Sequence, residues 1–287
     1  MWRRVRNILL FVLVLLLWTW WSNQNPMLHK ITIKSADIPE SFSGYRIAQV
    51  SDLHDAQFGE QHEKLIKLLK KSKADILVLT GDLVDARRTD LAQSMAFVRQ
   101  AAELLPVYYV PGNHESALVN NGDYAVLKNA LLDCGVTVLE DAKMRIEKDG
   151  EYVTLIGLRD TGFHPSPDGN DGVLSRSLIC GEQLAALTED DDAYRILLSH
   201  RPEMFATYAA MDIDLTFSGH AHGGQFRLPL LGGLYAPGQG VLPQYDGGLY
   251  KQDDSQMIVS RGLGNSSFPV RFNNRPELIV AELKRID

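Results

Sequence analysis

Five apolar, strand-forming runs in this chain each end in side chains that can bind a proton or a metal ion. The clearest run, residues 75–80, leads into Gly81-Asp82 and indicates a buried parallel strand. In an open α/β sheet the carboxyl ends of the strands face the crevice that holds ligands, so Asp82 is expected at a site. A single Asp after a strand is more often a turn or helix-capping residue. The repetition favours a site, because four further runs end in Asp52 and His54, in Asn113, His114 and Glu115, in His200, and in His220 and His222.

Helical and strand patterns alternate along the chain, which favours βαβ units. Apolar residues at helical spacing predict helices around Leu65 to Leu69, over 91–105 and over 123–134. Alternating residues predict an edge strand at 29–34, a hairpin around Lys148-Asp149-Gly150, and late strands at 249–251, 256–260 and 278–283. Residues 161–176 are predicted as a loop near the crevice, and 223–248 as irregular structure with short strands. The mixed order predicts an α/β domain with more than one sheet over residues 28–287.

Charge and cysteine content narrow the range of partners. The chain has 29 Lys and Arg against 36 Asp and Glu, a net charge of −7, so it presents no basic field for nucleic acid. With 287 residues and 45% hydrophobic content it can bury one large core. Cys134 and Cys180 lie far apart and form no CxxC pattern, which predicts core thiols while leaving a disulfide between them open. The spacing of residues does not indicate an oligomeric state.

Residues 1–27 have the composition of a membrane anchor. Arg3, Arg4 and Arg6 precede an uncharged, leucine-rich run over residues 8–21 that ends in tryptophans. The run is short for a full span of about 20 residues, although polar neighbours on both sides could extend it. No small-x-small cleavage site follows, which favours a retained anchor over a cleaved secretory signal. The positive-inside rule places the domain outside the cytoplasm, and the alternative is a monotopic helix on the cytoplasmic face.

The donor types at the strand ends predict a pair of divalent metal ions. A mixture of Asp, Asn and His suits manganese, iron or zinc, and the imidazoles argue against calcium. One ion cannot use all the donors. Two ions about 3.5–4 Å apart share a bridging carboxylate and hold the attacking and leaving oxygens of a phosphoryl displacement. Asp82, between the two halves of the set, is the expected bridge.

Taken together, these residues resemble the motif blocks of the calcineurin-like metallophosphoesterases. The blocks are Asp52-x-His54, Gly81-Asp82, Gly112-Asn113-His114-Glu115, His200 and Gly219-His220-x-His222, and their order and spacing match from about Leu28 to Lys284. The resemblance implies a four-layer α/β/β/α sandwich of two mixed sheets flanked by helices. It implies one metal held by Asp52, His54, Asp82 and His222, and another held by Asp82, Asn113, His200 and His220. It also implies that His114 contacts the phosphate as general acid and that a metal-bridging hydroxide is the nucleophile.

Two details concern substrate and subgroup. Many members have Asp where this chain has Glu115, so Glu115 either orients His114 or caps a helix. The segments 219–225, 262–265 and 269–272 are similar to a membrane-associated bacterial subgroup of phosphodiesterases and hydrolases of lipid-linked UDP-sugar diphosphates. The expected activity is therefore hydrolysis of a phosphodiester or diphosphate, with a lipid-linked substrate suggested by the anchor. The alternatives are a phosphomonoesterase, a protein Ser/Thr phosphatase, or a non-catalytic, metal-stabilised scaffold, which would be expected to lose ligands.

Other polar residues have two interpretations each. Arg271 either binds a phosphate oxygen of the substrate or forms a structural salt bridge, and Arg201 is predicted to be structural. His164 either touches substrate or is a solvated loop residue. His29 and His62 are predicted at the surface. Three tyrosines near the late strands either line the pocket or are half-buried beside those strands: Tyr235, Tyr245 and Tyr250.

Overall fold

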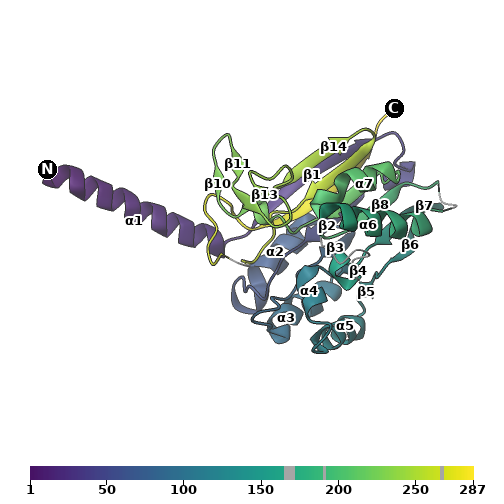
Figure 1. The fold of residues 1–287 in the computed structure, drawn as a ribbon, viewed down its shortest axis with the longest axis horizontal. Helices are drawn as coiled ribbons and strands as arrows, with labels where there is room; N and C mark the ends of the chain where they lie inside the picture. The colour runs from purple at the N-terminus through teal and green to yellow at the C-terminus, as the bar shows by residue number, and fades with distance from the viewer. Residues whose placement is uncertain (165–171, 190–191, 266–267) are drawn as a thin grey trace.

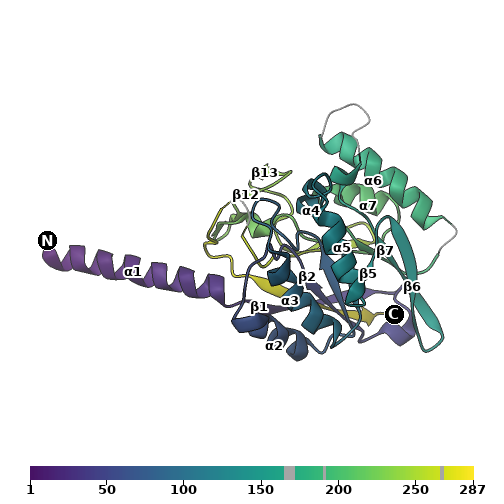
Figure 2. The same cartoon turned by 90° about the horizontal axis from the view of Figure 1, so that it is seen from below.

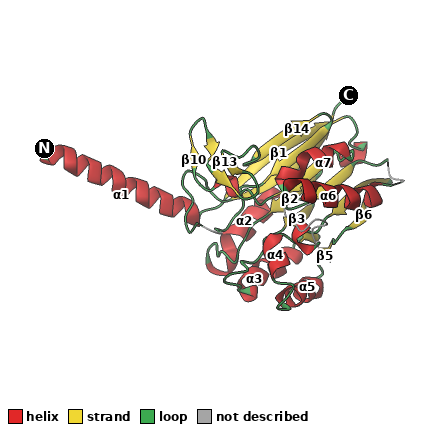
Figure 3. Ribbon diagram, viewed as in Figure 1, coloured by secondary structure: helices red, strands yellow, loops and turns green. Residues whose placement is uncertain are grey.

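Two six-stranded sheets form the centre of the domain in a computed structural model that describes residues 1–164, 172–189, 192–265 and 268–287. Figures 1 and 3 show the sheets packed together, with helices on the outside. The first sheet has, in spatial order, β1 (Met27–Ser35), β16 (Glu277–Arg285), β2 (Arg46–Val50), β3 (Ile76–Thr80), β4 (Val107–Val110) and β5 (Thr137–Val138). The second has β14 (Gly248–Gln252), β15 (Ser255–Val259), β9 (Leu215–Ser218), β8 (Arg195–Leu198), β7 (Glu151–Gly157) and β6 (Ala142–Lys148).

Both sheets are mixed, and their parallel strands set the position of the site. β2, β3, β4 and β5 are parallel, and β16 runs antiparallel to β2. In the second sheet β15, β9, β8 and β7 are parallel, with antiparallel strands at both edges. Parallel neighbours end at one edge of a sheet, so the residues that follow β2, β3 and β4 lie together, as do those that follow β8 and β9.

Helices cover the two outer faces and give the predicted four layers. α2 (Glu63–Ser72), α3 (Leu91–Ala102) and α5 (Asp123–Asp133) pack on the first sheet, where Leu65, Phe97 and Leu127 join its core. α6 (Val173–Thr188) and α7 (Phe205–Ala210) cover the second (Figure 2). A third core lies between the sheets and includes Val78 and Phe217. Full burial stabilises each such side chain by about 1.5–3 kcal/mol.

The predicted strands and hairpin are confirmed, and one predicted loop is wrong in part. β6 and β7 pair across Asp149 and Gly150, both at positive φ as a tight hairpin turn requires. The expected loop over 161–176 overlaps α6, which begins at Val173, while residues 165–171 lie outside the described residues. The helix was not predicted because its buried face contains the small residues Ser175 and Cys180 beside two larger apolar residues, which weakens the helical pattern of apolar residues.

The predicted irregular segment after residue 222 contains two small hairpins. One pairs β10 (Arg227–Leu228) with β11 (Gly232–Gly233), and the other pairs β12 (Tyr235–Ala236) with β13 (Gly240–Val241). A further short helix, α4 (Asn113–Ala117), follows β4 and opens with one of the predicted metal ligands. Both cysteines are free, and Cys180 is buried as predicted for a core thiol.

The N-terminal helix α1 (Trp2–Gln24) projects from the domain (Figure 1). Its 23 residues rise about 35 Å at 1.5 Å each, against a bilayer core of about 30 Å. It is long and apolar enough to cross a membrane, and most of its large side chains are exposed. The helix is longer than the uncharged run because it includes the N-terminal arginines and extends past Trp21. Its length and composition suggest a membrane anchor.

Candidate active site

The structure brings together all seven predicted metal ligands at the ends of five strands. One group comprises Asp52, His54, Asp82 and His222, and a second comprises Asp82, His200 and His220; within each group one ligand atom per residue lies within 4.8 Å of the others. Asn113 joins the second group, since its Oδ1 is 3.1 Å from His200 Nε2. Asp82 is the residue shared by both groups, in the position expected of a bridging carboxylate.

The backbone at these ligands is strained. Five of the seven have positive φ, a region that non-glycine residues rarely adopt. Each such residue costs on the order of 1–3 kcal/mol, and this kind of strain concentrates at functional sites where the surrounding structure enforces it. The strained ligands are Asp52 (φ 52°), His54 (φ 47°), Asp82 (φ 52°), His220 (φ 64°) and His222 (φ 48°).

Two glycines allow the ligands to approach one another. A Cβ at Gly81 would lie 2.6 Å from Nδ1 of His200 and 2.7 Å from the backbone of Gly112. A Cβ at Gly219 would lie 1.9 Å from Oγ of Ser51. Side chains at either position would collide with the site, and the space beside Gly81 is filled by the imidazole of His200.

Hydrogen bonds aim the ligands inward. His200 Nδ1–H donates to the Thr80 carbonyl at 2.8 Å, which turns Nε2 to within 3.3 Å of Asp82 Oδ2. The backbone N–H of His220 donates to Asp52 at 3.1 Å, and that of His114 donates to Asp82 Oδ1 at 2.8 Å. Such supporting bonds fix the orientation and tautomer of metal ligands.

The donor set fits divalent cations. His54 Nε2 and His222 Nε2 are 3.2 Å apart, and His220 Nδ1 and His200 Nε2 are 3.1 Å apart. Two imidazole lone pairs this close repel each other unless a proton or a cation lies between them. Each nitrogen pair has a carboxylate beside it, as the 3.4 Å from His222 Nε2 to Asp52 Oδ1 shows. Mixed nitrogen and oxygen donors suit manganese, iron and zinc alike.

Burial and mutual charge set the protonation of the cluster. Burial lowers the pKa of His54 to about 3, and it lowers the pKa values of His220 and His222 well below their usual range. Burial alone would also lower the pKa of His200, but the Asp82 carboxylate raises it to about 10. Burial raises the pKa of Asp52 to about 6. Three imidazoles are therefore neutral, with lone pairs available, and a cation at His200 would displace its proton.

His114 lies in the pocket with its tautomer set by the backbone. The Ala86 N–H donates to His114 Nδ1 at 3.0 Å, so the neutral ring carries its proton on Nε2. Nε2 is 4.0 Å from Asp82 Oδ2. Asp85, which the sequence analysis did not identify, places Oδ1 3.4 Å from Nδ1. Asp85 could have been predicted from the sequence, because it lies only three residues after Asp82 in the same loop.

Glu115 supports the backbone around Asp82. Its buried carboxylate accepts hydrogen bonds from the N–H groups of Gly112, Asp82 and Leu83 at 2.7–2.8 Å. This arrangement matches the expectation that Glu115 caps a helix, because Gly112 is the N-cap of α4. The carboxylate is occupied by these amides, so the alternative in which it orients the His114 ring is not what the structure shows. Burial, then the charge of Asp82, raises the pKa of Glu115 to about 7.

Two arginines lie behind the ligands. Arg271 is fully buried; it donates to the carbonyls of Gly264 and Arg261, and its Nη2 is 3.2 Å from His222 Nδ1. Arg271 was predicted either to bind a phosphate oxygen or to form a salt bridge. The structure shows neither, because its guanidinium donates to backbone carbonyls instead. Arg201 is structural as predicted, since it pairs bidentately with Asp160 at 2.6 and 3.1 Å.

The remaining histidines lie outside the cluster. His62 is fully buried, contrary to its predicted surface position, because Nε2 contacts the Gln93 carbonyl at 2.9 Å. His29 is part-exposed and pairs with Glu277 at 3.0 Å. His164 contacts Gln183 at 2.8 Å and lies 3.3 Å from Asp141 Oδ2, rather than in solvent or at the pocket.

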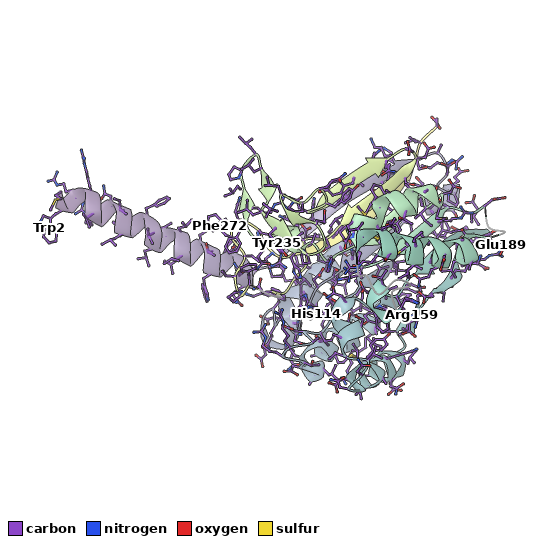
Figure 4. The ribbon with its side chains drawn as sticks, in the orientation of Figure 1. Trp2, His114, Arg159, Glu189, Tyr235 and Phe272 are labelled. Atoms are coloured by element: carbon purple, nitrogen blue, oxygen red, sulfur yellow. The ribbon has the colours of Figure 1, made fainter. Side chains whose placement is uncertain are left out.

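A cavity of about 360 Å³ opens onto the metal ligands. Figure 4 labels His114, which lies at its wall. Arg87 also lines the cavity, and its Nε is 3.5 Å from Asp85 Oδ1. Arg87 was not predicted as a site residue, although it is the first of two consecutive arginines that begin five residues after Asp82. The predicted tyrosines do not line this cavity in the described part of the chain: Tyr245 and Tyr250 pack edge-on against each other, and Tyr235 is exposed.

A two-sheet sandwich with shared carboxylate and imidazole donors at its strand ends defines a metallophosphoesterase. The chain belongs to the calcineurin-like phosphoesterase family, whose model matches residues 45–224. It is therefore a hydrolase.

Comparison with known proteins agrees with this assignment. The uncharacterized metallophosphoesterase YkuE of Bacillus subtilis is 31% identical over 88% of this chain and 84% of its own length. Phosphodiesterase YaeI of Escherichia coli is 26% identical over 83% and 82%. A transmembrane protein with metallophosphoesterase domain from Danio rerio is 26% identical over 91% of this chain and 58% of its own. The crystal structure of TT1561 of Thermus thermophilus shares the fold, with a TM-score of 0.51 at 17% identity, covering 76% and 90%.

Proposed function

We propose that this protein is a dinuclear-metal-dependent hydrolase of phosphodiester or diphosphate bonds that works at a membrane surface. The observation that carries the proposal is the position of Asp82 in both ligand groups. A carboxylate shared by two groups is what a two-ion site requires, and such sites act in displacements at phosphorus. The family membership supports hydrolysis at phosphorus as the reaction.

The residues divide between the two proposed ions. Asp52, His54, Asp82 and His222 would hold one, and Asp82, Asn113, His200 and His220 would hold the other. When bound, two divalent cations supply positive charge to the phosphoryl oxygens and lower the pKa of water. The protein contributes preorganised ligands, because the positive-φ backbone, the hydrogen bond from His200 to the Thr80 carbonyl and the bond from the His220 amide to Asp52 fix them before substrate arrives.

His114 is the proposed general acid. Its Nδ1 accepts a backbone hydrogen bond, which leaves Nε2–H directed to the pocket lined by Asp82, Asn113 and His222. A donor at this position can protonate a leaving oxygen. Arg87 places a guanidinium on the same wall, where it can bind a phosphate oxygen.

The location and the substrate class follow from α1 and remain proposals. The arginines at the N-terminal end of α1 favour a membrane anchor with the catalytic domain outside the cytoplasm. A domain held at a bilayer meets amphiphilic substrates at high local concentration, which supports a lipid-linked diphosphate, including the UDP-sugar class that the subgroup resemblance suggests. YaeI, named a phosphodiesterase, supports phosphodiesters as the second class.

The test compares the full-length protein with Asp82→Asn for metal content and for hydrolysis of phosphomonoesters, diesters and diphosphates. We expect close to two ions per chain in the parent, and loss of bound metal and turnover in the variant. His164→Asn is the matched control, because His164 lies outside the cavity. Turnover of Asp82→Asn equal to that of the parent would refute the two-ion site, and a preference for monoesters would refute the substrate class.

A further inference from the structure

Two hairpins and a loop form an apolar end of the domain beside α1. The hairpins are β10–β11 and β12–β13, and the loop comprises residues 268–272. Figures 1 and 2 show the hairpins at the end of the domain from which α1 emerges, and Figure 4 places Phe272 and Tyr235 there. Large apolar side chains are exposed across this apolar end, and they are Leu230, Leu231, Val241, Leu242, Phe268 and Val270. Several large apolar side chains exposed at one end of a domain suggest an interaction site.

Two of these leucines conflict with their own backbone. Leu230 has φ 69° and is fully exposed at the turn between β10 and β11, while Leu242 has φ 53° and is 55% exposed. Left-handed backbone favours glycine or asparagine, and water contact favours a polar residue. Leucine breaks both preferences without gaining burial in the protein. Residues that break local rules in this way are expected at functional or strained sites.

The charge around the apolar end suits a lipid surface. No Asp or Glu occurs over residues 225–245 or 262–276, although the chain carries 36 acidic residues. Arg227, the one cation of the first segment, pairs with Asp246 at 3.0 Å. A surface without carboxylates is not repelled by anionic headgroups.

Contacts with α1 hold the apolar end at the level of the helix tryptophans. The ring of Trp18 packs edge-on against Phe272, with centroids 6.4 Å apart. The Arg275 guanidinium lies 4.9 Å from the ring of Trp21. Asn23 exchanges two hydrogen bonds with the backbone of Arg271, at 2.8 and 2.9 Å. Tryptophan favours the membrane–water interface, so the loop lies at interfacial depth if α1 is in a bilayer.

A groove lies between the apolar helix α1 and the apolar end of the domain. A cavity of about 450 Å³ lies between α1 and the domain, with Leu16, Trp20, Phe58, Leu263 and Val270 among its lining residues. The groove also has polar lining residues, including Asn23, Gln57 and Asn265, and it lies directly between α1 and the loop.

We propose that the apolar end inserts into the interface of the same bilayer that holds α1, so the domain is seated on the membrane at two places. Pro237, in the turn between β12 and β13, lines the phosphoester pocket. Seating the hairpins on the bilayer therefore brings the pocket mouth to the membrane surface. The inference rests on the proposal that α1 is a membrane helix, and the experiment separates the two.

The test uses the full-length protein in phosphatidylcholine–phosphatidylglycerol vesicles, with a fluorophore at an introduced cysteine. Leu230→Cys reports the apolar end, Leu10→Cys reports α1, and Leu174→Cys is the control. Leu174 is 75% exposed near the start of α6, which packs on the second sheet and contributes no residue to the apolar end. The unsubstituted protein, labelled in the same way, gives the background from Cys134 and Cys180.

The vesicles contain lipids with a quencher on the acyl chain, so the loss of fluorescence measures how closely each labelled position approaches the bilayer. We expect at least about threefold stronger quenching at position 230 than at 174. Equal quenching at these positions overturns the seating, whatever the result at position 10. Weak quenching at position 10 alone overturns the anchor. A probe at 230 that is shielded from water but unquenched, in a protein that sediments as a dimer, assigns the apolar end to a second copy and also overturns the seating.

Charge substitutions give a second measurement. Leu230→Glu combined with Leu231→Glu is expected to lower the quenching of a probe at Val241→Cys severalfold. The matched pair Leu174→Glu and Leu178→Glu should leave it unchanged, because both leucines are exposed on α6. Unchanged quenching with the hairpin pair contradicts the proposal.

Discussion

Replacement of His114 by Asn tests the chemistry most directly. Asn keeps a short acceptor that can receive the Ala86 N–H, but it has no group in place of Nε2–H. Losing one neutral hydrogen bond costs about 0.5–1.5 kcal/mol, a small part of a typical stability of about 5–15 kcal/mol, so the domain should fold. The effect should therefore fall on the reaction.

The magnitude follows from the role of a general acid. Positioned proton transfer contributes about 10²–10⁴-fold, which corresponds to about 3–5 kcal/mol in the barrier at 1.36 kcal/mol per tenfold. His114 is suited to this size of effect, because its side chain is only 12% exposed and its tautomer is fixed. A leaving group that is stable as an anion needs no proton. We therefore expect the full loss for an alkyl leaving group and a loss at least about tenfold smaller for 4-nitrophenolate.

The assay measures kcat/KM for two phosphodiesters that differ only in this leaving group, on the metal-loaded parent and His114→Asn. His164→Asn serves as the control, since His164 contacts Gln183 outside the cavity. An equal loss for both substrates would mean that His114 binds the phosphate without donating a proton. Unchanged rates for both would remove His114 from the mechanism.

Two further predictions concern stability. Burial raises the pKa of Glu277, but hydrogen bonds from His29 and Arg261 outweigh it and lower the pKa from 4.5 to about 2. The difference, 4.5 − 2 = 2.5, corresponds to about 3 kcal/mol at 1.36 kcal/mol per unit, which is present above pH 4.5 and is lost as the pH falls towards 2. Urea unfolding of Glu277→Gln should show this deficit at pH 7 and little at pH 2.5, and a pH-independent deficit would contradict it. Asp160→Asn leaves the buried Arg201 without its bidentate partner, so the free energy of unfolding of the protein should fall by about 3–5 kcal/mol. A loss below about 1 kcal/mol would show that this ion pair does not stabilise the fold.

Local patterns account for the parts of the fold that could be predicted. Each strand that ends at the site is a short apolar run, and Ile76–Thr80 is buried along its whole length. The turn at Asp149-Gly150 and the helix over Glu63–Ser72 follow from residue type and spacing alone. α6 was missed because the side chains on its buried face are of mixed character, which weakens the periodic signal.

The sequence by itself determined which donors stand at the ends of which strands, and that the first residues form one apolar helix. Only the tertiary structure decided that Asp82 belongs to both ligand groups, that Glu115 is occupied by backbone amides, and that Arg271 packs behind His222. Only the structure shows that Leu230 has a positive φ and that its side chain is exposed to solvent. The physical reason is that residue type and spacing act within a few positions of the chain, whereas burial and hydrogen-bond partners depend on contacts across it. The bond from His200 to the Thr80 carbonyl spans 120 residues.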